Sequence, residues 1–114
     1  MGNNRKLKRR HLIYYLRVFD KNSGKLMGHL VDVTQEGILL ISEEPVPENT
    51  EYSLNMVLPE TLEGEEMIEF RATSLWSKRD INPSFIATGY KIHDLSTEKS
   101  GIISSLVERF GFND

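Results

Sequence analysis

Two short segments of the chain carry residues whose types and spacing suit the binding of an anionic ligand. The first, Arg5–Arg10, reads Arg-Lys-Leu-Lys-Arg-Arg and holds five of the 14 Lys and Arg residues. It contains no acid, and the rest of the chain holds all 17 Asp and Glu residues. Such a cluster indicates a surface for phosphates, nucleic acid or an acidic partner, and the alternative is a solvated N-terminus. Arg5, Arg9 and Arg10 place three guanidinium groups close together and are candidate ligand-binding residues.

The second segment, Asp32–Gly37, reads Asp-Val-Thr-Gln-Glu-Gly and follows a predicted strand. Alternation along a strand places Asp32 and Thr34 on the same face, where a carboxylate and a hydroxyl would lie side by side. Alone, this pattern is weak, because the same residues also form turns in which Asp and Thr bond to their own backbone. Asp32, Thr34 and Gly37 are therefore candidates that need support from the rest of the chain.

No pattern in the sequence predicts an enzyme or a metal site. His11, His29 and His93 lie in three different predicted strands without the spacing of metal ligands, and the chain has no Cys. No Ser lies in a Gly-x-Ser-x-Gly motif, and no Gly-rich phosphate loop precedes a helix. We therefore expect a binding protein with no catalytic residues, no metal and no resident cofactor.

Period-two alternation predicts about six short strands ahead of one helix. In residues 67–76, Ile68, Phe70, Ala72 and Trp76 are expected on one face, and residues 38–41 form an apolar strand expected to be buried on both sides. An acidic turn is expected at 59–65 and a polar loop at 77–83. Gly89, inside a strand, indicates a bulge or a close backbone approach. The predicted strands cover residues 11–19, 25–33, 38–41, 52–58, 67–76 and 84–93.

Apolar residues spaced four apart predict a helix over about 97–110, with Ser96 or Thr97 as its cap and Gly111 near its end. The 114 residues suffice for one domain with one core. Short strands followed by a helix indicate a small antiparallel barrel or sandwich, with the helix over an open end or edge. Neither a membrane span nor a secretory signal is visible, so a cytoplasmic location is expected.

In this order, with a strand pair between them, the two segments resemble the PilZ domain, a bacterial receptor module for cyclic di-GMP. That family carries Arg-x-x-x-Arg in an N-terminal arm, as at Arg5 and Arg9, and Asp/Asn-x-Ser-x-x-Gly after its second strand, as at 32–37. The resemblance runs from Arg5 to the final helix, and Trp76 and Gly89 also match positions that are often aromatic and Gly. It implies an all-β fold with a C-terminal helix: a six-stranded antiparallel PilZ-like β-barrel over residues 11–114, preceded by a flexible basic arm over residues 1–10.

The resemblance also implies a ligand, cyclic di-GMP, and roles for the candidate residues. The Arg side chains would clamp phosphates and guanine, Asp32 would accept hydrogen bonds from a guanine edge, and Trp76 would offer a stacking surface unless it packs in the core. Thr34 replaces the usual Ser, which keeps the hydroxyl but adds a methyl group that can crowd a purine. The register of the arm is open, since either Arg5 with Arg9 or Arg9 with Arg10 can make most of the contacts with the ligand.

Two alternatives remain open at this point. One is a degenerate PilZ-like adaptor that binds a protein partner without nucleotide, and Thr34 is the residue that keeps it open. The other is a small β-barrel that binds nucleic acid through the basic arm; the acidic body and the lack of aromatic residues interleaved with Lys and Arg on one face count against it. In the preferred interpretation the chain acts in trans on a downstream protein that the sequence does not identify, because a domain of this size carries no output module.

Overall fold

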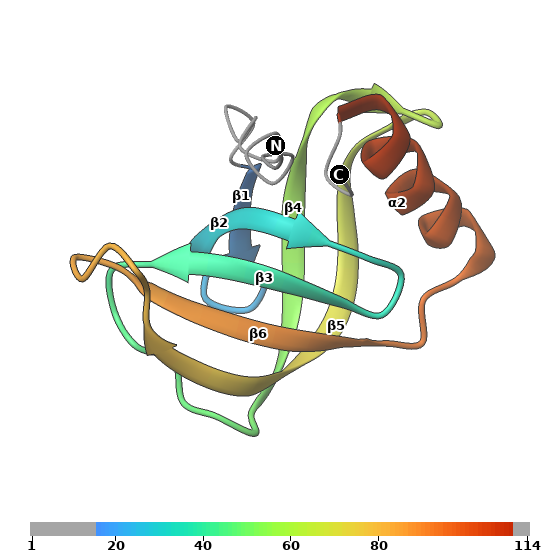
Figure 1. The fold of residues 1–114 in the computed structure, drawn as a ribbon. Coiled ribbons are helices and arrows are strands. Elements are labelled where there is room, and N and C mark those ends of the chain that lie inside the picture. Colours follow the sequence, from blue (N-terminus) through green and yellow to red (C-terminus); the bar gives the residue numbers. More distant parts are fainter. Residues whose placement is uncertain (1–15, 111–114) are drawn as a thin grey trace.

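The structure, a computed structural model, describes residues 16–110. They form an antiparallel closed barrel with strand order β1-β2-β3-β6-β5-β4, followed by one helix (Figure 1). The expected six-stranded barrel is therefore confirmed, and the sandwich alternative is excluded. The elements are β1 (Leu16–Asp20), β2 (Leu26–Val33), β3 (Gly37–Ser42), β4 (Glu51–Leu62), β5 (Glu65–Arg79), β6 (Ile86–His93) and α2 (Thr97–Phe110).

The longest strands, β4 and β5, extend past the ends predicted from the sequence. The acidic turn expected at 59–65 shrinks to Glu63 and Gly64, because Leu62 already pairs with Glu65. Both turn residues have positive φ, 53° and 83°, which is the backbone that a two-residue hairpin turn requires. At its other end β5 continues to Arg79, which pairs with Ile86. Residues 77–79 of the expected 77–83 loop are therefore strand, and the observed loop covers residues 80–85. The first half of the strand expected at 11–19 lies outside the described residues.

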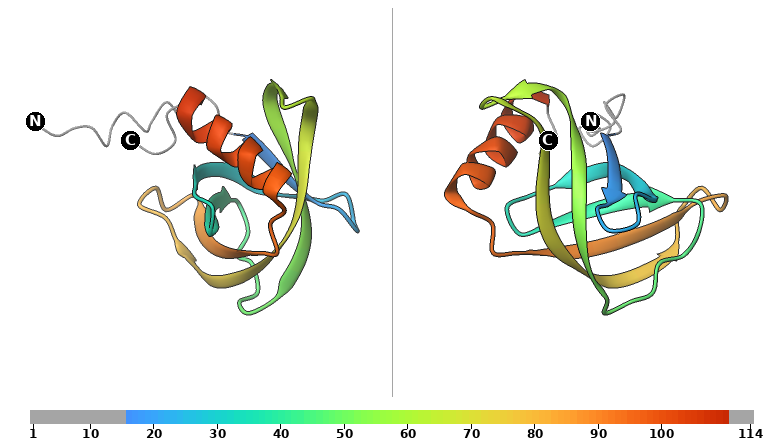
Figure 2. Two further views of the ribbon diagram at one scale, coloured as in Figure 1. Left: turned by 90° about the vertical axis from the view of Figure 1, so that its right-hand side faces the viewer. Right: turned by 180° about the vertical axis from the view of Figure 1, so that it is seen from behind.

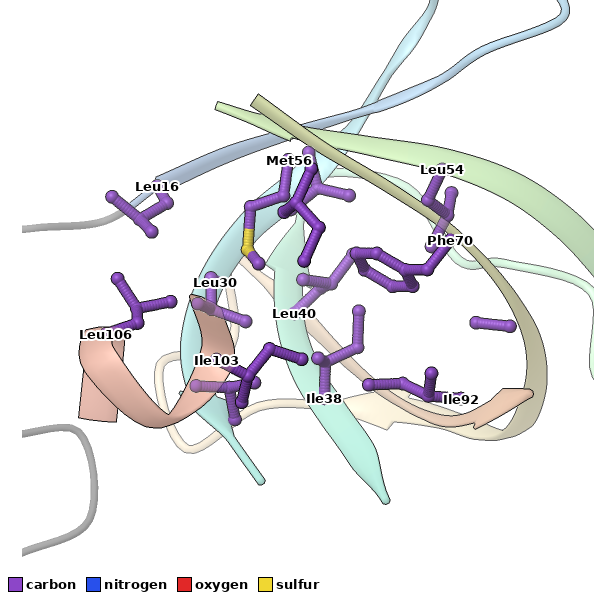
Figure 3. Close-up of a cluster of buried hydrophobic side chains, with 14 of the residues drawn as sticks. Leu16, Leu30, Ile38, Leu40, Leu54, Met56, Phe70, Ile92, Ile103 and Leu106 are labelled. Carbon is purple, nitrogen blue, oxygen red and sulfur yellow. The ribbon is translucent and has the colours of Figure 1, made fainter. Parts of the chain in front are cut away.

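The core fills the barrel with apolar side chains that alternate along each strand (Figure 3). In β3, Ile38 and Leu40 are buried, whereas Leu39 and Ile41 face outward and are only half-buried. The expectation that this strand is buried on both sides is wrong, because Leu39 and Ile41 stay partly exposed on its outer face. Four consecutive apolar residues therefore do not indicate a fully buried strand here, since two of them are only half-buried.

Helix α2 covers one end of the barrel (Figures 1 and 2). Ser96 caps it, since its Oγ accepts a hydrogen bond from Lys99 N at 3.1 Å. Ile103 and Leu106 point from the helix into the same core as Leu30 (Figure 3). The predicted cap, apolar stripe and position over an open end are thus confirmed. No helix in residues 16–110 is long and apolar enough to cross a membrane.

Candidate ligand-binding site

A bulge in β2 decides where the Asp32 side chain points. Leu30 pairs with Leu40, but Asp32 pairs with Leu39, so Val31 is an extra residue without a counterpart on β3. Under strict alternation Asp32 would share the inner face of Leu30, which is fully buried. The bulge shifts the alternation by one residue and leaves Asp32 half-buried on the outer face.

A second bulge, in β5, does the same for Trp76. Ser74 pairs with Tyr90 and Trp76 pairs with Gly89, so Leu75 is the extra residue. Ser74 is 0% exposed and faces inward, whereas Trp76 is 39% exposed and faces outward. The expectation that Trp76 shares the face of Ile68, Phe70 and Ala72 is therefore wrong beyond Ser74, and the cause is the bulge. The core-packing alternative for Trp76 is excluded.

The two bulges align four residues in one cross-strand row on the outside of the barrel. Asp32 pairs with Leu39, Leu39 with Gly89, and Gly89 with Trp76. Three strand spacings of about 4.8 Å separate Asp32 from Trp76 by about 14 Å along the curved sheet. A shallow depression of about 280 Å³ lies along this row. We call it the outer depression; it is also lined by Val33, Thr34, Gly37, Ile38, Leu75 and Tyr90.

The Trp76 indole can lie in the outer depression because residue 89 is Gly and has no side chain in its way. A Cβ atom on Gly89 would lie 2.6 Å from Cε2 of Trp76, closer than side chains tolerate. The indole ring therefore lies directly over the Gly89 backbone, which confirms the close approach expected there from the sequence. Lys78 Nζ lies 5.2 Å from the ring centroid, within the range of a cation–π contact. The depression thus has an aromatic wall with a cation beside it, and sequence reasoning missed this Lys.

The candidate turn is stabilised by the Thr34 side chain. Its Oγ1 accepts hydrogen bonds from Glu36 N at 3.1 Å and Gly37 N at 3.2 Å, and Thr34 N donates to Gly37 O at 2.9 Å. Asp32 Oδ1 accepts from Val33 N at 2.9 Å. These are the local bonds that any Asp-x-Thr-x-x-Gly turn can form. Within residues 16–110 no hydrogen bond reaches Asp32 Oδ2, and contact of either side chain with a base stays a prediction.

The turn is also fixed to its neighbours. Gln35 Nε2 donates to Ser104 Oγ at 2.9 Å, and Ser100 Oγ donates to Gln35 Oε1 at 2.6 Å, which connects the turn to α2. Gly37 is needed because a Cβ there would lie 2.6 Å from the Tyr90 carbonyl oxygen on β6. The candidate residues of the turn are therefore held by both the helix and the sheet.

Arg5, Arg9 and Arg10, the remaining predicted site residues, lie outside the described residues. The described chain begins at Leu16, which pairs with Leu30 on β2, two residues before Asp32. Arg10 precedes Leu16 by six residues. Six extended residues span about 20 Å, so the outer depression is within reach of Arg10.

A second cavity of the described chain was not predicted from the sequence. It has a volume of about 780 Å³ and shares no lining residue with the outer depression. Its walls come from separate segments: the 20–29 hairpin, residues 41–47, Tyr52 and Phe85. No local pattern could have indicated it, because the topology alone brings these segments together. Within residues 16–110, no group of three or more His, Asp or Glu residues is arranged to hold a metal ion.

A closed six-stranded barrel with a C-terminal helix is a PilZ-like fold, as the sequence resemblance implied. Among solved structures, the chain is similar to that of the Bacillus subtilis inhibitor of motility, MotI/DgrA, a PilZ-fold protein, with a TM-score of 0.62 and 10% sequence identity. The match covers 88% of this chain and 48% of that protein, so this chain spans about half its length. At this identity the likeness shows the fold alone. No family model matches the chain, and no curated protein matches it in sequence.

Proposed function

We propose that this protein is a bacterial, cytoplasmic receptor for cyclic di-GMP that acts as an adaptor on another protein. The observation that carries the proposal is the cross-strand row Asp32–Leu39–Gly89–Trp76, which we call the outer row. It brings Asp32 and Trp76 to one depression although they are far apart in sequence. These are two of the residues that the sequence resemblance assigns to the ligand. The arm with Arg5, Arg9 and Arg10 supplies the remaining contacts.

The chemistry of the depression suits guanine better than adenine. An outward carboxylate such as Asp32 accepts hydrogen bonds from the N1–H and the exocyclic amine of guanine, and adenine offers no such pair of donors. Trp76 offers a stacking surface worth roughly 1–3 kcal/mol per base. The separation of these two residues, about 14 Å along the curved sheet, suits a ligand larger than a single base.

The depression alone is too small and too open to hold such a ligand. Ligand pockets typically enclose about 300–1,000 Å³, and this one measures about 280 Å³. We propose that the basic arm forms the missing wall, with guanidinium groups on the phosphates and the guanine O6 and N7 atoms. Ordering the arm costs about 1–2 kcal/mol per residue, so several Arg side chains must bind together. The ordered arm then changes a surface that the partner protein recognises.

An adaptor role is also in keeping with the structural neighbour. MotI/DgrA is named as an inhibitor of motility, which describes a regulator. The proposal extends to this chain only that kind of role, acting in trans on an unidentified protein.

Calorimetric titration tests the proposal. Cyclic di-GMP should bind, whereas GTP, cyclic di-AMP and a short single-stranded oligonucleotide should not. Binding of the oligonucleotide alone, with steep salt dependence, would replace the proposal by a nucleic-acid binder. Absence of binding to all four ligands would favour an adaptor that needs no nucleotide.

Amide hydrogen exchange tests the clamping role of the arm. We expect amides 5–10 to exchange rapidly without ligand and to become protected when cyclic di-GMP is added. Equal exchange of these amides in both states, with nucleotide bound, would contradict the proposed role of the arm.

A further inference from the structure

The cavity of about 780 Å³ lies at the end of the barrel away from α2. Its lining comes from the 20–29 hairpin, residues 41–47, Tyr52 and Phe85, where the strands end on the side of the barrel away from the helix. We call it the barrel-end pocket. Its volume falls within the range of ligand-binding pockets, about 300–1,000 Å³.

The wall of the barrel-end pocket is largely apolar and is supplied by large side chains. Leu26 is 42% exposed, and Tyr52, which lines the same pocket, is half-buried. Phe85 is half-buried in the wall of the pocket but outside the core cluster. The apolar residues that line the pocket are Leu26, Met27, Ile41, Pro45, Val46, Pro47, Tyr52 and Phe85. Side chains of this kind bind an apolar anchor group.

A further exposed apolar side chain lies outside the pocket lining, in the 80–85 loop that ends at Phe85. Ile81 is 97% exposed at the tip of this loop. The loop is closed by two backbone hydrogen bonds, Asp80 N to Phe85 O at 2.9 Å and Phe85 N to Asn82 O at 3.0 Å. The same short loop therefore presents Ile81 to solvent and places Phe85 in the pocket. A small molecule confined to the pocket would leave Ile81 exposed, whereas a polypeptide crossing the rim would cover it.

The charges at the pocket favour a cationic ligand. Three carboxylates line it, those of Asp20, Glu43 and Glu44, against one ammonium group, that of Lys25. Lys25 already lies 3.7 Å from Glu44, and Asp20 accepts hydrogen bonds within its own turn from Asn22 N and Ser23 Oγ. Besides Lys25, His29 is the second basic residue in the lining. The rim remains negative overall with the ion pair formed.

The negative charge of Asp20 also acts on Tyr52 in the pocket wall. Burial raises the pKa of the Tyr52 hydroxyl, and the negative charge of Asp20 raises the same pKa further, while a hydrogen bond with Thr50 works in the opposite direction. The field of the rim thus reaches the apolar wall, where a bound cation would experience it.

We infer that the barrel-end pocket is a docking site for a segment of a partner protein that presents a large apolar side chain flanked by Lys or Arg. The apolar anchor enters between Leu26 and Phe85, the cationic neighbour faces Asp20 and Glu43, and the flanking chain covers Ile81. The site extends the proposed function by giving the partner a place to bind. Nucleotide is not needed for this contact, so either proposal can fail alone.

The test uses two matched peptides and the full chain labelled with ¹⁵N, without nucleotide. The basic probe is the acetylated, amidated hexapeptide Gly-Lys-Phe-Leu-Lys-Gly, and in the acidic probe both Lys residues are replaced by Glu. With the basic peptide we expect saturable amide shifts in residues 26–29, 41–47 and 81–85, and weaker binding of the acidic peptide. The inference is overturned if the basic peptide causes no shifts at millimolar concentration, if the shifts lie elsewhere, or if both peptides bind equally.

Two variants and one control separate the pocket from the overall charge. Phe85→Ala should abolish the saturable shifts, because it removes one wall of the anchor pocket. Glu43→Lys should raise the Kd for the basic peptide about fivefold, as expected for reversing one exposed charge. Glu66→Lys makes the same charge change at an exposed position outside the pocket and should leave the Kd unchanged. Equal effects of the two Lys variants would reduce the contact to non-specific attraction and overturn the inference.

Discussion

Two neighbouring rows of side chains on the same four strands have opposite character. The inner row, Val33–Ile38–Tyr90–Ser74, is at most 5% exposed, and its members pair across β2, β3, β6 and β5. The outer row, Asp32–Leu39–Gly89–Trp76, lies directly beside it and borders the outer depression. The barrel therefore places core residues and the residues of the proposed ligand site in adjacent rows. Two bulges, at Val31 and Leu75, determine which residue belongs to which row.

The largest expected effect comes from the outer row. Asp32→Ala should weaken cyclic di-GMP binding at least about 100-fold, because two charge-assisted hydrogen bonds of about 1.5–3 kcal/mol each are lost. Arg9→Ala should also abolish detectable binding. The thermal midpoint should hardly move in either variant, since Asp32 is half-buried outside the core. Calorimetry and thermal unfolding measure both quantities, with Glu65→Ala as an exposed acidic control. A large loss of stability in Asp32→Ala would show that this residue belongs to the structural row instead.

Gly89→Ala should affect stability and binding together, because Gly89 belongs to the outer row and its backbone lies under the Trp76 indole. Its Cβ would lie 2.6 Å from the Trp76 ring, and overpacking of this kind typically costs 1–3 kcal/mol of unfolding free energy. The displaced indole should also weaken nucleotide binding. Gly101→Ala is the matched control: apart from neighbouring backbone of α2 itself, no atom lies within 4 Å of its Cβ position, and it should stabilise the protein by about 0.5–1 kcal/mol. Chemical denaturation of both variants checks the pair, and unchanged stability of Gly89→Ala would contradict the close contact.

Thr34 should distinguish the role of a hydroxyl from that of a methyl group. Thr34→Ala removes the acceptor for the two backbone N–H groups of Glu36 and Gly37 and should lower the unfolding free energy by about 1 kcal/mol. Thr34→Ser keeps the acceptor and should leave stability close to that of the parent chain. If the methyl group crowds the purine, the Ser variant should also bind cyclic di-GMP more tightly. Equal stability of the Ala and Ser variants would mean that the hydroxyl does not hold the turn.

The smallest expected effect lies in the inner row. The Tyr90 hydroxyl is buried and has no hydrogen-bond partner within residues 16–110, and burial raises the pKa of this hydroxyl. Tyr90→Phe removes the unsatisfied group while keeping the ring and its edge-on contact with Tyr52. Stability should rise by up to about 1 kcal/mol, and nucleotide affinity should not change. A clear fall in either quantity would show that the hydroxyl has a partner and that the two rows are coupled.

The sequence was sufficient to predict the elements and their order. Alternating apolar residues predicted the strands, and the four-residue spacing of Ile102 and Leu106 predicted the helix, because both patterns follow from which face is buried. The Asp32–Gly37 turn and the positions of Trp76 and Gly89 were likewise visible as a resemblance. These features depend on neighbours in sequence or on a known family pattern.

The bulges and the barrel-end pocket could not be predicted in the same way. Val31 and Leu75 are ordinary strand residues, and an extra residue in one strand becomes visible only against the register of its partner strand. Trp76 was therefore assigned to the wrong face. The pocket depends on loops that meet only after the barrel has closed. Arg5, Arg9 and Arg10 lie outside the described residues and stay predictions.

The closed order of the strands limits how any partner can bind. Within residues 16–110 each of the six strands has a hydrogen-bonded neighbour on both sides. A partner therefore finds no whole edge strand to extend, and recognition by strand addition would require opening the barrel. Contacts must be made by side chains at the surface or at the ends. The partner's affinity should consequently depend on individual side chains such as Phe85, and single substitutions should be able to retune it without disturbing the main-chain framework.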